Sequence, residues 1–163
     1  MIQSAKENDA PEGFNPVTIG GIYATRSGPL FARWTGEHML LGFRVQPYHV
    51  NPANQCHGGM LALFADMFLS TAALYQTDMA RHFLPTISLQ TDFLAPAPLG
   101  AWIEGKADVL RKTHSLVFVQ GLVCADGLPI LRASAVFKLG ALISDDAENQ
   151  TISRESAPRA STA

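Results

Sequence analysis

The chain has 163 residues, enough for one ordinary domain with a buried core. Twelve lysines and arginines against fourteen aspartates and glutamates give a net charge of −2, so the chain lacks the positive excess of a nucleic-acid-binding protein. Charged residues make up only 16% of the chain, which favours a surface partly covered by another subunit.

The two ends of the chain are polar. Residues 1–16 have no apolar core segment, so we expect a flexible N-terminal arm and no secretory signal. Residues 143–163 are rich in Ser, Thr, Ala and charge, and we expect a disordered tail there. The folded domain is then predicted over 17–142. Cys56 and Cys124 form no CxxC pair, which favours a reducing cytoplasm over a disulfide scaffold.

Two short apolar segments and one long helix open the predicted domain. Residues 30–34 and 39–45 surround a turn and suit strands. After a turn-prone stretch over 47–56, residues 60–76 contain no Pro or Gly and predict a helix. This segment is apolar nearly all round, so we expect other structure to wrap it. It is shorter than the roughly 20 residues of a membrane span and carries Asp66 near its middle, so we expect no membrane crossing.

Four strand-like segments rich in Val, Ile, Phe and Thr follow the helix. They cover 86–94, 102–111, 116–125 and 130–139. Asp126-Gly127 is typical of a hairpin turn between the last two. One helix cannot cover both faces of such an antiparallel sheet, so we predict that the sheet curls around it.

Asp66 is the only charged residue between Gly58 and Gln76. A carboxylate in an apolar helix is costly to bury unless it is paired, protonated or facing a cleft. One interpretation is that it faces solvent or caps a neighbouring backbone. The other is a base or nucleophile in a partly dry pocket, which the flanking Ala65 and Met67 favour.

His57-Gly58-Gly59 opens the same helix, where backbone N–H groups are unpaired and the helix dipole favours negative charge. Glycines carry no side chain to block access, so a substrate carbonyl could approach these N–H groups and be polarised. A tight turn with unusual backbone angles is the alternative. Asn51, in the loop before the helix, suits a turn or cap, or a group that holds water or a substrate carbonyl.

Gly58 and Asp66 lie eight residues apart on this helix. At about 1.5 Å per residue the separation is roughly 12 Å. Groups that act on one carbon must approach it within about 3.5 Å, so one helix cannot easily supply both. Two antiparallel copies around a two-fold axis can, which predicts a site between subunits if both residues act.

The segment from Asn51 to Asp66 combines an Asn, a few residues, His-Gly-Gly, and an Asp nine residues after the His. This pattern resembles the signature of hotdog-fold acyl-CoA thioesterases in the PaaI-like branch. The resemblance extends through residues 85–97 (PTISLQTDFLAPA) and the Asp126-Gly127 hairpin. Asn54 stands where the family commonly has Gly, and Asn tolerates left-handed backbone angles well.

The resemblance implies an α+β hotdog fold, with a curved antiparallel sheet wrapped around one long central helix, in a homodimer or a homotetramer built from two dimers. It implies hydrolysis of acyl-CoA at the dimer interface, without a metal and with coenzyme A only as part of the substrate. Position by position, Asp66 would be general base or nucleophile and Gly58 N–H would polarise the thioester carbonyl. Asn51 would orient water or substrate, His57 would support the loop or the leaving group, and Thr86 would position the water.

Further residues are candidates for contacts with the substrate. Gly59 leaves the helix start open, and Ser88, two residues after Thr86, is expected on the same strand face. Basic residues between two strands could meet the phosphates of coenzyme A or be merely solvated. Apolar residues of the helix could line an acyl pocket or belong to the core. These candidates are Arg111, Lys112 and His114 for the phosphates, and Met60, Phe64, Phe68 and residues 81–83 for the acyl group.

Two alternatives stay open. Cys56 at the helix start could be a nucleophile with a lowered pKa, although no supporting acid is evident. The second alternative is a non-hydrolytic hotdog protein that binds acyl-CoA, or a dehydratase-like enzyme. The Asp nine residues after His57 favours thioester cleavage over this second alternative. We find no GxSxG, P-loop, GxGxxG or HExxH motif, and the histidines lack metal-ligand spacing. We expect no nucleic-acid or membrane partner.

Overall fold

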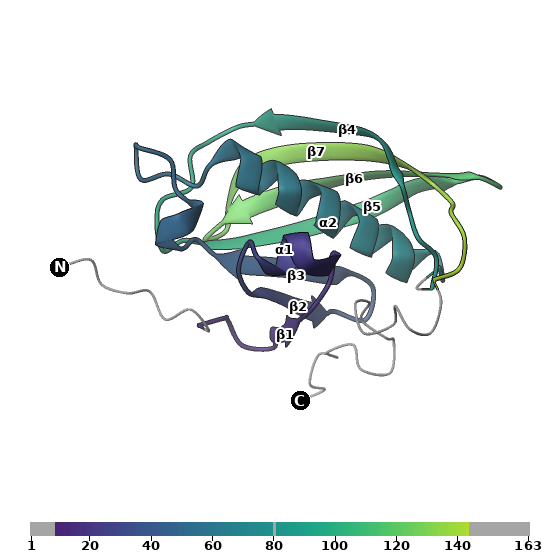
Figure 1. The fold of residues 1–163 in the computed structure, drawn as a ribbon, viewed down its shortest axis with the longest axis horizontal. Coiled ribbons are helices and arrows are strands. Elements are labelled where there is room, and N and C mark those ends of the chain that lie inside the picture. The colour runs from purple at the N-terminus through teal and green to yellow at the C-terminus, as the bar shows by residue number, and fades with distance from the viewer. Residues whose placement is uncertain (1–8, 80, 144–163) are drawn as a thin grey trace.

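The computed structural model describes residues 9–79 and 81–143. Within these residues, seven strands form one antiparallel sheet in the order β1-β2-β3-β5-β6-β7-β4. Figure 1 shows the sheet curling around the long helix α2 (Gly58–Gln76). The strands are β1 (Asn15–Val17), β2 (Leu30–Trp34), β3 (Met39–Arg44), β4 (Thr86–Phe93), β5 (Trp102–Lys112), β6 (Leu116–Ala125) and β7 (Leu128–Lys138). The predicted α+β architecture, a curved sheet wrapped around one central helix, is confirmed.

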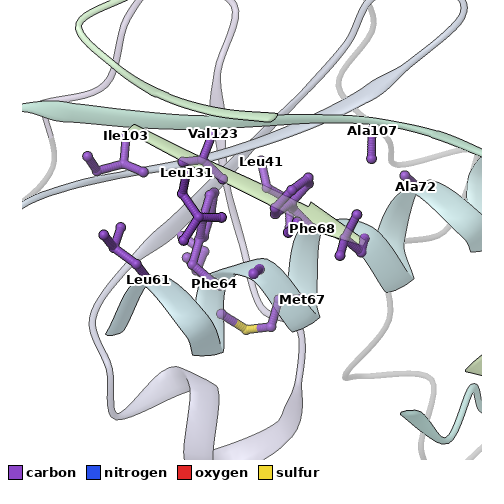
Figure 2. Close-up of a cluster of buried hydrophobic side chains, with 14 of the residues drawn as sticks. Leu41, Leu61, Phe64, Met67, Phe68, Ala72, Ile103, Ala107, Val123 and Leu131 are labelled. Atoms are coloured by element: carbon purple, nitrogen blue, oxygen red, sulfur yellow. The ribbon is translucent and has the colours of Figure 1, made fainter. Parts of the chain in front are cut away.

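Helix α2 lies close to the sheet because two glycines make room for it. A Cβ atom on Gly105 of β5 would lie 2.7 Å from the ring of Phe68, and one on Gly121 of β6 would lie 2.5 Å from the same ring. Both strands therefore lack a side chain where Phe68 packs. Phe64, one turn earlier, is also fully buried, and Figure 2 shows both rings on the sheet side of the helix, whereas Met67 lies on the other side. Burial of this face is the main stabilising contribution of α2.

Helix α2 begins two residues before the predicted start, at Gly58, with His57 as its N-cap. It is the one helix, among the described residues, whose length and hydropathy would suit a membrane span. Of the window that meets this criterion, 56% is buried inside the fold. A helix buried in the core of a curved sheet has the same length and hydropathy, so these two properties are weak evidence for a membrane span here.

Three short elements were not predicted. They are strand β1, the five-residue helix α1 (Gly21–Thr25), and the 3-10 helix η1 (Pro47–His49). Helix α1 follows Gly20, and both Gly20 and Gly21 have left-handed φ angles, 72° and 69°. A change of chain direction of this kind requires glycine, and the sequence analysis predicted no helix after it.

Part of the expected N-terminal arm packs on the outer face of the sheet, away from α2. Phe14 is buried against Trp102, with ring centroids 5.0 Å apart. Arg44 donates hydrogen bonds from Nε to the carbonyl of Asp9 at 2.8 Å and from a terminal nitrogen to the carbonyl of Gly100 at 2.9 Å. Packing therefore begins before residue 17. Residues 1–8 of the arm and 144–163 of the expected tail lie outside the described residues.

Candidate active site

Asp66 and Thr86 meet between the middle of α2 and the start of β4. The hydroxyl of Thr86 donates a hydrogen bond of 2.7 Å to Oδ1 of Asp66. Asp66 is half-buried, and among the described residues its second oxygen, Oδ2, has no hydrogen-bond partner. One oxygen is thus held in place by a hydroxyl, while the other is free to accept a proton or a hydrogen bond.

A β-bulge places Thr86 on the helix side of β4. Thr86 pairs with the buried Phe137 of β7, and Ser88 pairs with the adjacent Val136, so Ile87 is the extra residue. Neighbouring residues on β7 point to opposite faces, and their partners do the same. Our expectation that Ser88 shares a face with Thr86 is therefore wrong: Ser88 lies on the outer face of the sheet, because the bulge resets the alternation.

A cavity of about 630 Å³ opens beside Asp66. Asp66, Thr86 and a run of apolar side chains line it. Four parts of the chain supply the walls: the segment around α1, the face of α2 that points away from the sheet, residues 82–86, and Ile143. Its size falls in the range of about 300–1,000 Å³ found for small-molecule sites.

The start of α2 leaves one backbone donor available. His57 Nδ1 accepts a hydrogen bond of 2.8 Å from Gly59 N–H, and the carbonyl of His57 accepts from Met60 N–H and Leu61 N–H. Within the described chain, Gly58 N–H has no such partner. Gly59 N–H is occupied by the cap, so Gly58 is the donor of the glycine pair that can meet a substrate oxygen.

Asn51 organises the loop that leads into this helix. Its Oδ1 accepts from Ala53 N–H at 2.9 Å and from Gln55 N–H at 3.2 Å, which leaves the side-chain NH₂ for water or substrate. Asn54 adopts a left-handed φ of 56°, as predicted for an Asn in place of Gly. The same helix start lies roughly 12 Å from Asp66 by the rise of an α-helix, so Gly58 and Asp66 of one chain are not neighbours.

Phe64 does not line the cavity. Its side chain is fully buried in the core, with its ring centroid 5.0 Å from that of Phe43 and 5.6 Å from that of Phe68. The expectation of Phe64 as an acyl-contacting residue is therefore wrong, because its side chain points to the sheet (Figure 2). Phe68 is in the core for the same reason.

The three basic candidates lie elsewhere. Arg111, Lys112 and His114 are exposed around the turn between β5 and β6, and none of them lines the cavity. The structure therefore does not bring them to Asp66.

The Cys56 thiol is not activated as a nucleophile, although Cys56 is next to His57 in the sequence. Its thiol is buried, and desolvation raises the pKa of Cys56 to about 12. The nucleophilic form of a cysteine is the thiolate, which this environment disfavours. A cysteine-dependent mechanism thus finds no support in the geometry.

The cavity wall around α1 was not predicted from the sequence. Ile19, Tyr23 and Ala24 line the cavity with Gly20 and Gly21. The paired glycines beside an apolar Ile-Tyr-Ala segment were the available signal. Of the segment predicted to contact the acyl group, His82 and Phe83 do line the cavity.

The sequence profile of the thioesterase superfamily matches residues 53–129, from the loop before α2 through Asp66 and Thr86 to the β6–β7 turn. This part of the chain belongs to the thioesterase superfamily. The family predicted from the His-Gly-Gly and Asp spacing is thereby confirmed. Membership of this superfamily supports thioester hydrolysis as the class of reaction.

Similar proteins match most of this chain. PA0474 of Pseudomonas aeruginosa, which carries an esterase name, is 27% identical over 132 residues, or 80% of this chain and 98% of the relative. A Ralstonia eutropha protein described as a thioesterase related to phenylacetic acid degradation is 22% identical with a TM-score of 0.64, covering 81% of this chain and 94% of that one. A Streptococcus pneumoniae protein described as a thioesterase with coenzyme A is 14% identical with a TM-score of 0.62, covering 71% and 88%. These structures share the hotdog fold.

Proposed function

We propose that this protein hydrolyses acyl-CoA thioesters to a free acid and coenzyme A, with Asp66 as the general base or nucleophile. The observation that carries the proposal is the Asp66–Thr86 hydrogen bond at the wall of a largely apolar cavity. It holds a carboxylate on the side of an apolar helix that borders open space. A carboxylate in this setting can take a proton from water or attack a carbonyl carbon.

The hydrolysis needs few groups. As a base, Asp66 takes a proton from a water molecule, whose oxygen attacks the thioester carbonyl carbon. The carbon–sulfur bond then breaks, the coenzyme A thiolate leaves, and a carboxylic acid forms. As a nucleophile, Asp66 attacks the same carbon to give a mixed anhydride, which water then cleaves. In both routes the oxygen of the thioester carbonyl gains negative charge, which a backbone N–H stabilises.

Gly58 N–H supplies this donor in our proposal, from a second copy of the chain. Two α2 helices running antiparallel around a two-fold axis bring Gly58 of one copy towards Asp66 of the other. Strand β4 supports such an assembly, because it is an edge of the sheet and exposes Ile87, Phe93 and the adjacent Leu94. Exposed apolar edge strands favour pairing with another chain. We therefore propose a homodimer, or two dimers in a tetramer, with two sites per dimer.

The supporting roles follow from the same arrangement. Thr86 positions the water against Asp66. The loop over the helix start is shaped by Asn51 and His57, and Asn51 keeps an NH₂ group for water or substrate. Coenzyme A as the thiol part is supported by the Streptococcus pneumoniae relative that was crystallised with it. A reaction without metal or further cofactor, in a reducing cytoplasm, remains our prediction.

Asp66→Asn tests the proposal. Asn keeps the shape and can still accept the hydrogen bond from Thr86, but it is neither a base nor a nucleophile. We expect turnover of acyl-CoA, followed by release of free thiol, to fall about 10²- to 10⁴-fold. The melting temperature and the oligomeric mass should stay close to those of the native protein.

Glu37→Gln is the matched control, since Glu37 is an exposed carboxylate at the β2–β3 turn. It should leave turnover unchanged. Near-native turnover of a folded Asp66→Asn protein would reject the assignment of Asp66. Binding of acyl-CoA without thiol release by the native protein would indicate a non-hydrolytic binding protein instead.

A further inference from the structure

Part of the lining of the cavity beside Asp66 comes from outside the matched family segment, from the N-terminal side and from Ile143. The superfamily profile covers residues 53–129, whereas Ile19, Tyr23 and Ala24 line the cavity from the N-terminal side. Helix α1, α2 and residues 82–86 all line this cavity, and Figure 1 shows α1 beside α2. The shape of this cavity therefore depends on a part of the chain that the shared motif does not specify.

Helix α1 is seated on α2 by close contacts. Ala24 is almost fully buried, and a Cβ atom on Gly20 would lie 2.8 Å from the Cβ of Ala24 and 3.3 Å from Sδ of Met67. Met67 projects from α2 on the side away from the sheet (Figure 2). Since Gly20 also has a left-handed φ, a side chain at this position would be strained and would push α1 away from α2.

The end of α1 is tied to the loop that carries the helix start of the site. His49 Nε2 donates a hydrogen bond of 2.6 Å to the carbonyl of Ser27, and Ser27 N–H donates to the carbonyl of Ala24 at 2.9 Å. The carbonyl of His49 accepts from His57 N–H at 2.8 Å. One buried residue, His49, thus connects α1 through its side chain with the entry to α2 through its backbone carbonyl, and the wall is fixed relative to the site.

The chemistry of the lining favours the acyl part of a substrate over the nucleotide part. Most of the lining side chains are aliphatic or aromatic, and of the described residues no Lys or Arg lines the cavity. Phosphate recognition calls for cationic side chains, whereas an acyl chain calls for apolar walls. Asp66 lies in the same wall, so an acyl group in the cavity would have its thioester carbon near the carboxylate.

We propose that α1 is the specificity-determining wall of the acyl site, with Tyr23 limiting the size of the apolar acyl group that fits between α1 and α2. This inference rests on the proposed thioester hydrolysis. Tyr23 and its neighbour Ile22 are similarly exposed, at 75% and 72%, yet only Tyr23 lines the cavity. The two residues therefore form a matched pair for the test.

Tyr23→Ala, Tyr23→Trp and Ile22→Ala are compared on acetyl-, hexanoyl-, decanoyl- and phenylacetyl-CoA. We expect Tyr23→Ala to raise the ratio of kcat/KM for the largest acyl groups over acetyl by about tenfold, the scale of a small change in an apolar pocket. Tyr23→Trp should lower that ratio, and Ile22→Ala should leave it unchanged. Because Tyr23 is exposed, these variants are expected to fold.

Binding separates this inference from the proposed function. The same ratios are measured as Kd values by calorimetry in an Asp66→Asn background, where hydrolysis does not interfere. An unchanged ratio in both readouts for both Tyr23 variants would overturn the role of α1 while leaving hydrolysis intact. A change in oligomeric mass in Tyr23→Ala, with unchanged selectivity, would make this surface a contact between copies and overturn the proposal as well. Native protein that binds but does not hydrolyse acyl-CoA would reject the proposed function alone, since the Kd ratios still test the wall.

Discussion

Both sides of helix α2 are mostly apolar, but one side packs into the core and the other lines the cavity. The side facing the sheet carries Phe64 and Phe68, which are fully buried in the core. The other side carries Leu63, Asp66 and Met67, which line an open cavity. Hydrophobicity alone does not distinguish the two, because an apolar side chain suits both a packed core and an apolar binding site. The difference lies in what the rest of the chain places opposite each side.

Phe68→Ala should give the largest effect on stability. It leaves a hole where two glycine-containing strands close on the ring, and such truncations cost about 3–5 kcal/mol. Leu63→Ala on the cavity side should cost less, because Leu63 is only half-buried and borders space that is already open. Urea unfolding of both variants checks the contrast. Similar losses would show that the cavity side is packed as tightly as the core side.

Gly121→Ala tests the tight packing on the sheet side of α2 from the strand that contacts Phe68. The added Cβ would lie 2.5 Å from Phe68 and 2.6 Å from the carbonyl of Lys106, so we expect a loss of about 1–3 kcal/mol from overpacking. The double variant with Phe68→Leu should recover part of this loss, because the ring is one of the three clashing groups, beside the carbonyl of Lys106 and the Cβ of Ala107. Purely additive losses in urea unfolding would contradict the packing described here.

Thr86→Ala should weaken catalysis by about three- to tenfold, the scale of one hydrogen bond to a carboxylate at an exposed position. Ser88→Ala is the matched control, since it removes a hydroxyl from the outer face of the same strand. Steady-state kinetics on one acyl-CoA substrate compares them. Equal losses would contradict the bulge at Ile87, and Thr86→Ser should restore most of the activity.

The smallest expected effect is a loss of stability in mild acid, caused by the protonation of His49. Burial lowers the pKa of His49 below its ordinary 6.5, against the opposing effect of hydrogen bonds between His49 and the backbone of Ser27 and Arg44. A group that resists protonation in the fold stabilises it fully above the unfolded pKa, and this contribution decreases as pH falls below that value. Urea midpoints should therefore fall more steeply between about pH 7 and pH 5.5 than in His49→Gln. The exposed His114→Gln should keep the native pH dependence.

Most of the fold could be predicted because its signals are local. The helix after His57 and the strands rich in Val and Ile are periodic or apolar over long stretches, and the structure places them within about two residues of the predicted bounds. The need to cover one apolar helix then dictates a curled sheet. Asp66 stood out for a local reason as well, as a lone charge in an apolar segment.

The rest of the site depends on placement that local patterns do not encode. Tyr23 reaches the cavity because two left-handed glycines turn the chain, and the glycine pair by itself does not tell which element lies opposite the segment that follows. Phe64 is as apolar as Leu63, and only the direction of its side chain puts it in the core. Arg111 and its neighbours form a basic cluster in sequence, but they are exposed around the turn between β5 and β6 and do not line the cavity.

The irregularity in β4 has a chemical consequence. Two consecutive residues there face a single partner, Phe137, so the strand before and after this point is out of phase. In a straight strand of the same length, Ile87 would stand opposite Phe137, and a hydrocarbon branch rather than an alcohol would touch the acid. Counting residues along β4 from Thr86 therefore does not give the face of each side chain. In a homologous chain without the extra residue, the hydroxyl that contacts the acid would have to come from the residue directly before the one equivalent to Ser88.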